Sequence, residues 1–247
     1  MTHEYCLDLE PRNPGLFLAC CGLFELADLL APGAFAWFAE SGRRFHLHTA
    51  AALPPTAPYD LDPPPDFGQV PYEKALEPLT LHAAGRALTL DWWLNPMRTD
   101  KSILKTWGGQ QSSRGVMTEL LAQLRPLPCA DLLQHRVYAK SRFGVDARSA
   151  WDALDAGYSP NDFNQPGVTY PWVEVLAVIG LQGFRPEALP KRRFRYAVWF
   201  APLPLPAARA AASAPWPGLP AARFCFELAT RGQGYKTFLF AEGEEHE

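Results

Sequence analysis

Two long apolar runs, each opened by a proline, dominate the hydrophobic pattern of the chain. Residues 13–30 read NPGLFLACCGLFELADLL, residues 170–184 read YPWVEVLAVIGLQGF, and both contain Ala-x-x-Gly-Leu. Only Glu25 and Asp28 are charged in the first run, so the rest of that helical surface must be buried. Asn13 suits an N-cap, and the proline after it suits the first helical position, where its missing N–H costs nothing. The pattern predicts two mostly buried helices, over 14–31 and about 171–183.

Alternating polar and apolar residues surround these two helices and predict strands. We expect strands at 4–10, 43–49, 87–93, 192–200, 223–230 and 235–241. The middle of the chain has helical spacing instead. One apolar face runs along 114–124, and a second helix is predicted over 146–160, with Asp146 as its N-cap and Gly157 at its C-terminal end.

A strand, a buried helix and a strand headed by Arg-Arg-Phe occur near both ends of the chain. This order predicts an α+β fold of ferredoxin-like (RRM-like) β-α-β units, with 1–247 as a single compact unit. Two pseudo-repeated halves, 1–97 and 160–247, would then flank a basic helical insertion at 98–159. Alanine and glycine at the shared spacing also let a helix lie close on a sheet, so packing alone could produce the similarity of the two runs. Whether the two halves arose by duplication therefore stays open.

Composition narrows the class of protein. The chain has 247 residues, of which 48% are hydrophobic, which excludes a disordered chain. The first predicted helix is shorter than a membrane span, and the N-terminal residues do not resemble a signal peptide. Five cysteines show no CxxC or CxxH spacing, so we expect buried, reduced thiols. We predict a cytoplasmic protein with no membrane partner and no cofactor.

The net charge of −3 conceals a segregation of charge along the chain. Residues 98–148 hold nine Lys or Arg against four Asp or Glu, and residues 185–209 hold six against one. Residues 1–97 are acidic, with five against twelve. Two basic blocks in an acidic protein indicate a localised anionic partner, with a pair of solvated faces as the plain alternative.

Sequence motifs give little sign of catalysis. His46 and His48 would project from one side of a strand and could ligate a metal, but no third ligand follows at a recognisable spacing. RGQGYKT at 231–237 lacks the spacing of a phosphate loop. The stretch GGQQSS at 108–113 could present backbone N–H groups to a phosphate or form a flexible helix entry. We predict that the protein is not an enzyme and binds no metal.

Four segments together resemble a known group of proteins. They are LDLEPRNPGLFLACCGLFELADLL, SRFGVDARSAWDALDAGYSPND, YPWVEVLAVIGLQGFRP and RYAVWFAPLPLPAARAA. Over most of the chain they resemble the small proteins of type I-G (formerly I-U) CRISPR–Cas loci. Those proteins are regarded as compact versions of the Cascade large subunit or as divergent repeat-associated (RAMP) relatives.

The resemblance implies a non-catalytic Cascade subunit at one end of a filament that carries crRNA. Such a subunit helps to read the PAM in target double-stranded DNA and leaves cleavage to a recruited helicase-nuclease effector. The implied partners are crRNA, target double-stranded DNA, the other Cascade subunits and that effector. The chain is smaller than most large subunits, which leaves open whether PAM reading and nuclease recruitment both reside here.

Three basic groups are the predicted nucleic-acid contacts, because cations hold phosphates, amides read base edges and aromatic rings stack on bases. The first surrounds GGQQSS and comprises Arg98, Lys101, Lys105, Gln110, Gln111 and Arg114. The second precedes and enters the helix predicted at Asp146 and comprises Lys140, Arg142 and Arg148. The third alternates with aromatic residues and comprises Lys191, Arg192, Arg193 and Arg195.

Two other functions remain as alternatives. One is a RAMP filament subunit that grips crRNA and binds single-stranded RNA by itself. The other is a metal-independent endoribonuclease that processes crRNA, with His135 near Lys140 as its acid or base.

Overall fold

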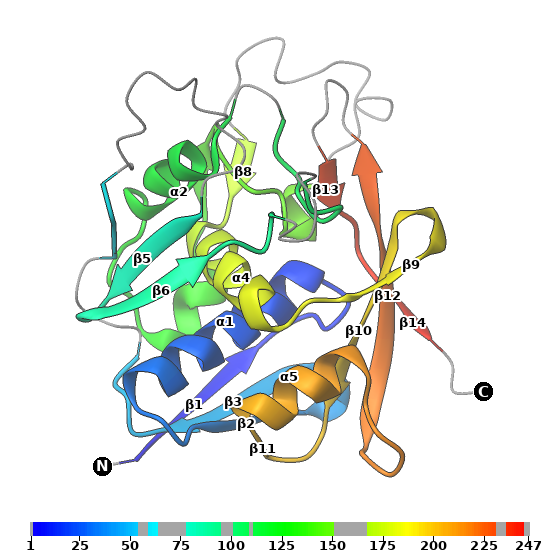
Figure 1. The fold of residues 1–247 in the computed structure, drawn as a ribbon. Helices are drawn as coiled ribbons and strands as arrows, with labels where there is room; N and C mark the ends of the chain where they lie inside the picture. Colours follow the sequence, from blue (N-terminus) through cyan, green and yellow to red (C-terminus); the bar gives the residue numbers. More distant parts are fainter. Residues whose placement is uncertain are drawn as a thin grey trace.

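The computed structural model describes residues 2–53, 59–63, 78–94, 101–108, 111–150, 167–230 and 236–244. Within these ranges the fold is mixed α+β, as expected, with several antiparallel sheets around a central helix pair (Figure 1). The α-helices described are α1 (Pro14–Leu30), α2 (Ser113–Leu121), α4 (Pro171–Gly183) and α5 (Leu205–Ser213). No helix among the described residues is long and apolar enough to cross a membrane.

The two apolar runs form α1 and α4, which confirms both predicted helices. Asn13 caps α1 through its side chain, which accepts a hydrogen bond from the Gly15 N–H at 3.0 Å. Every residue of α1 from Pro14 to Ala27 is buried, and so is every residue of α4 from Pro171 to Leu181. The two helices therefore form the centre of the hydrophobic core (Figure 1).

Glycines at the shared spacing bring α1 and α4 against each other. A Cβ atom added to Gly22 would overlap the carbonyl oxygen of Leu176, and one added to Gly180 would overlap that of Leu18. Each contacted leucine lies one helical turn before the other glycine, so the contact is reciprocal. The prediction that these glycines lie against a sheet is wrong. Each glycine removes a side chain so that the other helix can approach.

The first sheet holds β1 (His3–Asp8), β2 (Phe35–Ala39), β3 (Arg44–Thr49) and β11 (Leu203–Pro204) in the order β1-β3-β2-β11. All of its pairs are antiparallel, so β1 and β2 run parallel with β3 between them. β1, α1 and β2 thus make a split β-α-β unit. The inner face of this sheet is buried, with Leu7, Phe38 and Phe45 at most 1% exposed.

The second sheet contains β9 (Glu187–Leu189), β10 (Arg193–Trp199), β12 (Ala221–Thr230), β13 (Lys236–Phe238) and β14 (Glu242–Glu244). Its order is β13-β12-β10-β9, and β14 also pairs with β12. The strand before α4, β8 (Gly167–Thr169), pairs instead with β7 (Val137–Ala139) in a separate sheet. The second predicted β-α-β unit therefore does not form within one sheet, and the ferredoxin-like arrangement is not confirmed.

The segments that follow α1 and α4 share a different order of elements. After each central helix comes a short strand, a 3₁₀ turn and a longer strand that pairs back antiparallel. The turns are η1 (Glu40–Gly42) and η4 (Pro190–Arg192), and each holds two adjacent non-glycine residues in the left-handed region. The strand on the far side of the longer strand is β1 in the first sheet and β12 in the second. The repeated unit is thus α-β-β. The strand that pairs with it on the far side precedes the helix in the first sheet (β1) and follows the helix in the second (β12).

The remaining strands and the middle of the chain close the molecule. β4 (Asp60–Leu61), β5 (Leu79–Ala83) and β6 (Arg86–Leu90) form a three-stranded sheet. The described part of 98–159 holds α2, β7 and the 3₁₀ helices η2 (Cys129–Gln134) and η3 (Ala147–Ser149). It sends Trp107 and Phe143 into the core, so it is integrated with the rest. Only the start of the helix predicted over 146–160 is described, as η3, since 151–166 lie outside the described residues.

A buried polar network fixes the starts of both central helices. The Asn13 side chain donates to Asp146 at 2.7 Å and accepts from the Ala147 N–H at 3.2 Å. Glu174, in the first turn of α4, accepts from the Gly144 N–H at 2.9 Å. Burial raises the pKa of Glu174 to about 7, and the neighbouring Asp146 adds to that effect. One short loop, 144–147, thereby supplies hydrogen-bond partners to α1 and α4.

Candidate nucleic-acid interface

β13 brings together segments that are far apart in the sequence. The Lys236 N–H donates to the Thr106 carbonyl at 2.8 Å, and the Phe238 N–H donates to the Gly144 carbonyl at 3.0 Å. On its other side β13 pairs with β12, where Lys236 lies opposite Thr230. The guanidinium of Arg192 donates to the Thr230 hydroxyl at 3.0 Å. The first and third predicted basic groups therefore meet at this strand.

Four cations form what we call the basic cluster: Lys101, Lys105, Arg192 and Lys236. Lys101 and Arg192 are exposed, Lys236 is half-buried, and Lys105 is 8% exposed. The Lys105 ammonium donates to the Trp107 carbonyl and lies 4.6 Å from the centre of the Trp107 ring. Its charge is thus held in place near Lys101 and Lys236.

Burial and like charges lower the pKa values of two lysines in the basic cluster. Burial lowers the pKa of Lys105 to about 8, and the positive charges of Lys101 and Lys236 add to that effect. Burial also lowers the pKa of Lys236, and Arg192 adds to it. Within the described part of the chain no carboxylate forms an ion pair with any of the four. A bound anion would relieve this repulsion, because it favours the charged form of each group.

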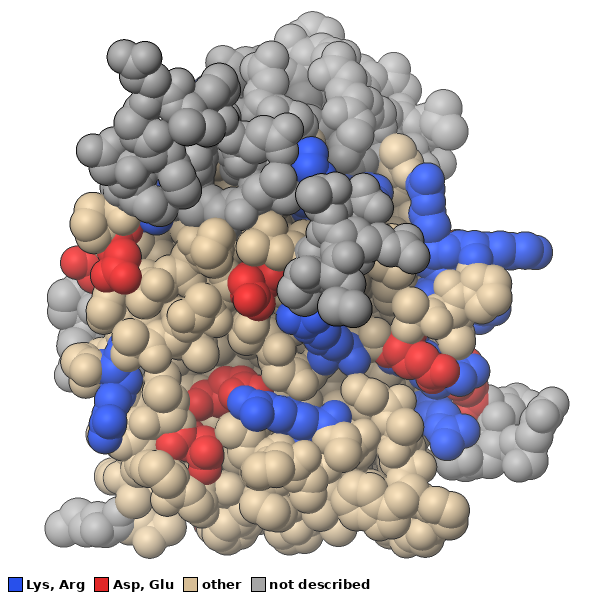
Figure 2. Space-filling view, viewed as in Figure 1, with Lys and Arg blue, Asp and Glu red and all other residues tan. Residues whose placement is uncertain are grey.

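Charge on the surface follows the same arrangement. Lys and Arg side chains gather along the right-hand edge of the molecule, where β9, β10 and β12 lie in Figure 1, with acidic side chains among the lower of them (Figure 2). The exposed Lys191, in the turn between β9 and β10, extends the cationic surface beyond the basic cluster. Lys191 and Arg192 both adopt left-handed backbone angles. Glu40 and Ser41 do the same in the equivalent turn, so this strain belongs to the fold.

Several predicted contacts are instead engaged within the protein. Arg195 makes ion pairs with Glu244 at 2.6 Å and with Glu187 at 3.1 Å. Arg193 lies 3.8 Å from Glu227. Arg148 binds Asp146 at 2.7 Å and stacks 3.5 Å above the Tyr170 ring. These three arginines thus pair with carboxylates of the protein itself. A count of charges along the sequence does not reveal such pairs.

The remaining predicted residues lie in varied surroundings. Arg142 donates to the Val168 carbonyl at 3.4 Å, and burial lowers its pKa against the opposing effect of Glu174. Arg114 donates to the Asp62 carbonyl at 2.5 Å. Gln111 is half-buried, and its side-chain oxygen has no hydrogen-bond partner among the described residues. Lys140 is exposed, whereas Arg98 and Gln110 lie outside the described residues.

Lys236 is the member of the basic cluster that the sequence analysis missed. It sits in a predicted strand, where a single lysine carries no signal of its own. Only the pairing of β13 with β12 and its hydrogen bond to Thr106 place it beside Lys105. Register between distant strands follows from the packed structure, so no local pattern could have identified this residue.

His135, the residue of the nuclease alternative, is half-buried. Burial lowers its pKa, and the nearby Arg125 adds to that effect. Its Nδ1 atom has no hydrogen-bond partner in the described part of the molecule. No described carboxylate therefore orients this imidazole in the way that general bases are normally held.

Comparison of the chain with protein-family models, with curated proteins and with solved structures found no match.

Proposed function

We propose that this protein is a non-catalytic subunit of a type I CRISPR surveillance complex, Cascade, and that it holds nucleic acid through the basic cluster. Its role would be to contribute to PAM and target-DNA recognition and to nuclease recruitment. The observation that carries the proposal is the meeting of Lys101, Lys105, Arg192 and Lys236 without a described carboxylate partner. The resemblance of four sequence segments to type I-G proteins supports the assignment to Cascade.

A polyanion suits this surface better than an isolated small anion. The exposed cations Lys101, Lys191 and Arg192 come from two segments of the chain, which favours contacts to successive phosphates along a backbone. In RNA-guided complexes base pairing reads the sequence, while protein holds the backbone and a short flanking duplex. A cationic cluster of this kind fits the holding of a nucleic-acid backbone.

The test is the salt dependence of target-DNA binding by the assembled, crRNA-loaded complex. Each phosphate contact releases condensed counterions, so log affinity falls with log salt by about 0.9 per contact on duplex DNA. We expect the double variant Lys101→Ala/Lys236→Ala to weaken binding and to make the slope shallower by about 1.8. Electrophoretic mobility shifts with PAM-flanked duplex over a range of salt concentrations would measure both quantities.

The matched control is Arg86→Ala/Arg223→Ala, which removes the same charge from two exposed positions outside the basic cluster. This control should give the same slope of log affinity against log salt as the parent, within experimental error. A cluster variant that binds DNA within about twofold of the parent, with an unchanged slope, would refute the proposal.

The same preparations distinguish the alternatives. If the cluster variant loses crRNA and its DNA binding falls only in proportion, the protein is a filament subunit that grips the guide. If the purified protein cuts repeat RNA in EDTA and His135→Ala abolishes the cut, it is the endoribonuclease. The Cascade proposal expects intact RNA and unchanged crRNA content.

A further inference from the structure

The outer face of the first sheet carries a group of metal-ligating side chains. Glu4 and Cys6 lie on β1, and His46 and His48 lie on β3. Cys6 pairs with His46 and Glu4 pairs with His48 in the β1–β3 register. Because strand side chains alternate between faces, all four project away from the buried side that holds Leu7, Phe45 and Leu47.

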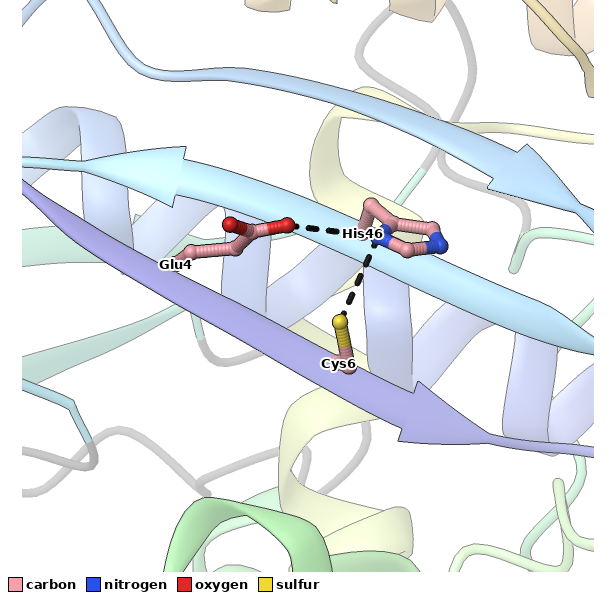
Figure 3. Close-up of side chains that lie close together, drawn as sticks. All are labelled: Glu4, Cys6 and His46. Carbon is pink, nitrogen blue, oxygen red and sulfur yellow. Dashed lines mark hydrogen bonds and ion pairs between the residues drawn. The ribbon is translucent and has the colours of Figure 1, made fainter.

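The ligating atoms already converge. The Cys6 Sγ atom lies 3.3 Å from His46 Nδ1, and the Glu4 Oε1 atom lies 3.7 Å from the same nitrogen (Figure 3). One ligating atom from each of the three residues lies within 4.8 Å of the others. A tetrahedral zinc ion, with bonds of about 2.0–2.3 Å, holds its ligands about 3.3–3.6 Å apart. The side chains therefore need only small movements to surround such an ion.

Neighbouring rings hold the imidazoles in place. The His46 ring stacks on Trp37 with centroids 4.7 Å apart and an angle of 3° between planes. His48 stacks on Phe35 at 4.9 Å. Its Nε2 atom is buried, has no hydrogen-bond partner among the described residues, and lies 3.3 Å from Glu4 Oε1. His48 is thus positioned to orient the Glu4 carboxylate, as outer-shell partners of metal ligands do.

The surrounding charges also favour a cation. The Glu4 carboxylate lies within 4.8 Å of the Cys6 sulfur, which places a negative group at the site. Asp8 is nearby but is paired with Arg44 at 3.0 Å. Cys6 is exposed, so solvent and ions can reach the site. A divalent cation between Glu4 and Cys6 would stabilise the thiolate and the carboxylate together.

We propose that Glu4, Cys6 and His46 form a zinc site on the outer face of the first sheet, with the fourth position open to solvent. A sulfur, a nitrogen and an oxygen ligand suit zinc, whereas magnesium and calcium prefer oxygen alone. The site does not depend on the proposed function. His46 and His48 lacked a third ligand in the sequence because that ligand comes from the paired strand.

The test is zinc binding by the full-length protein after dialysis against EDTA. Isothermal titration with ZnCl₂ should give one ion per chain for the parent. Cys6→Ala and His46→Ala should each weaken binding by at least about 100-fold, since losing a ligand costs more than losing an outer-shell partner. His48→Ala should weaken it by about 10–100-fold. His82→Ala, at a half-buried histidine that pairs with Asp62 at 2.6 Å, is the control and should bind like the parent.

Cobalt gives a second readout, which reports the identity of a ligand in addition to binding. Co²⁺ in the parent should show a thiolate-to-metal charge-transfer absorption that Cys6→Ser lacks, while the circular dichroism of both proteins stays the same. Zinc binding that survives unchanged in Cys6→Ala and His46→Ala would overturn the proposal. So would a parent that binds no zinc, or a cobalt spectrum without a thiolate band.

Discussion

A single buried lysine connects the interior of this protein with its charged surface. Lys105 rests against the Trp107 ring and carbonyl, yet it lies close enough to Lys101 and Lys236 for their charges to lower its pKa. Burial and like charge both favour the neutral amine. The free protein therefore holds a group that titrates near neutrality, and an anion that binds above it will change that titration.

This predicts that DNA binding weakens as pH rises through about 8. Below that pH Lys105, whose pKa is about 8, is already charged, so affinity should be flat. Above it the free protein has lost the proton, and binding must take it up again because the phosphates favour the ammonium. The lowered pKa of Lys236 acts in the same direction. Fluorescence anisotropy with a labelled duplex between pH 7 and pH 9.5 would measure the change.

The variants for this measurement follow from burial. Lys105→Met should lower affinity at pH 7 and flatten the dependence on pH. Lys140→Met, at an exposed lysine, should keep the dependence of the parent. An affinity that stays constant or rises up to pH 9.5 in the parent would show that Lys105 is not coupled to the bound nucleic acid.

At the scale of elements, the helices could be predicted and their partners could not. Asn13, the proline after it and the unbroken apolar run define α1 by local chemistry, and the structure confirms the helix. Gly22 lies in that run, but no local pattern says whether a glycine faces a sheet or another helix. The answer comes from Leu176 and Gly180, which meet Gly22 only in the folded chain.

We expect Gly22→Ala and Gly180→Ala to destabilise the protein strongly. In each case the new Cβ atom would overlap a backbone carbonyl oxygen of the facing helix, which cannot rotate away. Overpacking of this kind costs about 1–3 kcal/mol or more. That exceeds the gain of about 1 kcal/mol that alanine offers over glycine in a helix. Urea denaturation followed by circular dichroism would give the change in the free energy of unfolding.

Gly115 in α2 provides the control for these two glycines. A Cβ atom there meets only the Ser112 hydroxyl, at 3.2 Å. Gly115→Ala should therefore leave stability unchanged or slightly higher. If Gly22→Ala and Gly180→Ala behave like Gly115→Ala, the helices are not in the contact described.

For the whole molecule, the sequence predicted β-α-β units near both ends of one compact unit and left open whether they form two halves. The described structure joins two α-β-β parts through many cross-contacts. The Tyr196 hydroxyl donates to the Pro11 carbonyl, and the Trp199 indole donates to the Ala36 carbonyl at 2.8 Å. Arg209 of α5 binds Glu25 of α1. Strand order and cross-strand neighbours depend on such contacts. Local sequence patterns therefore could not predict Lys236 in the basic cluster, or Glu4 and Cys6 beside His46.

These cross-contacts predict that the protein unfolds as one cooperative unit. Residues of the first part, such as Phe17, stack directly on residues of the second, such as Tyr196, with ring centroids 4.5 Å apart. Thermal unfolding monitored by far-ultraviolet circular dichroism and by tryptophan fluorescence should therefore give superimposable transitions. Two separated transitions would show that the two parts are independent domains.

The separation of α1 from α4 along the chain has a consequence during synthesis. The surface of α1 is apolar almost all round. Its main partner α4 is made only after residues 31–170, which separate the two helices. Until then the first sheet can cover one side of α1, while the side that carries Gly22 stays exposed to solvent and to other nascent chains. Apolar surface that stays exposed until its partner is made promotes aggregation and recruits chaperones. The glycine contact that gives the finished protein its dense centre thus leaves α1 vulnerable until α4 has been made.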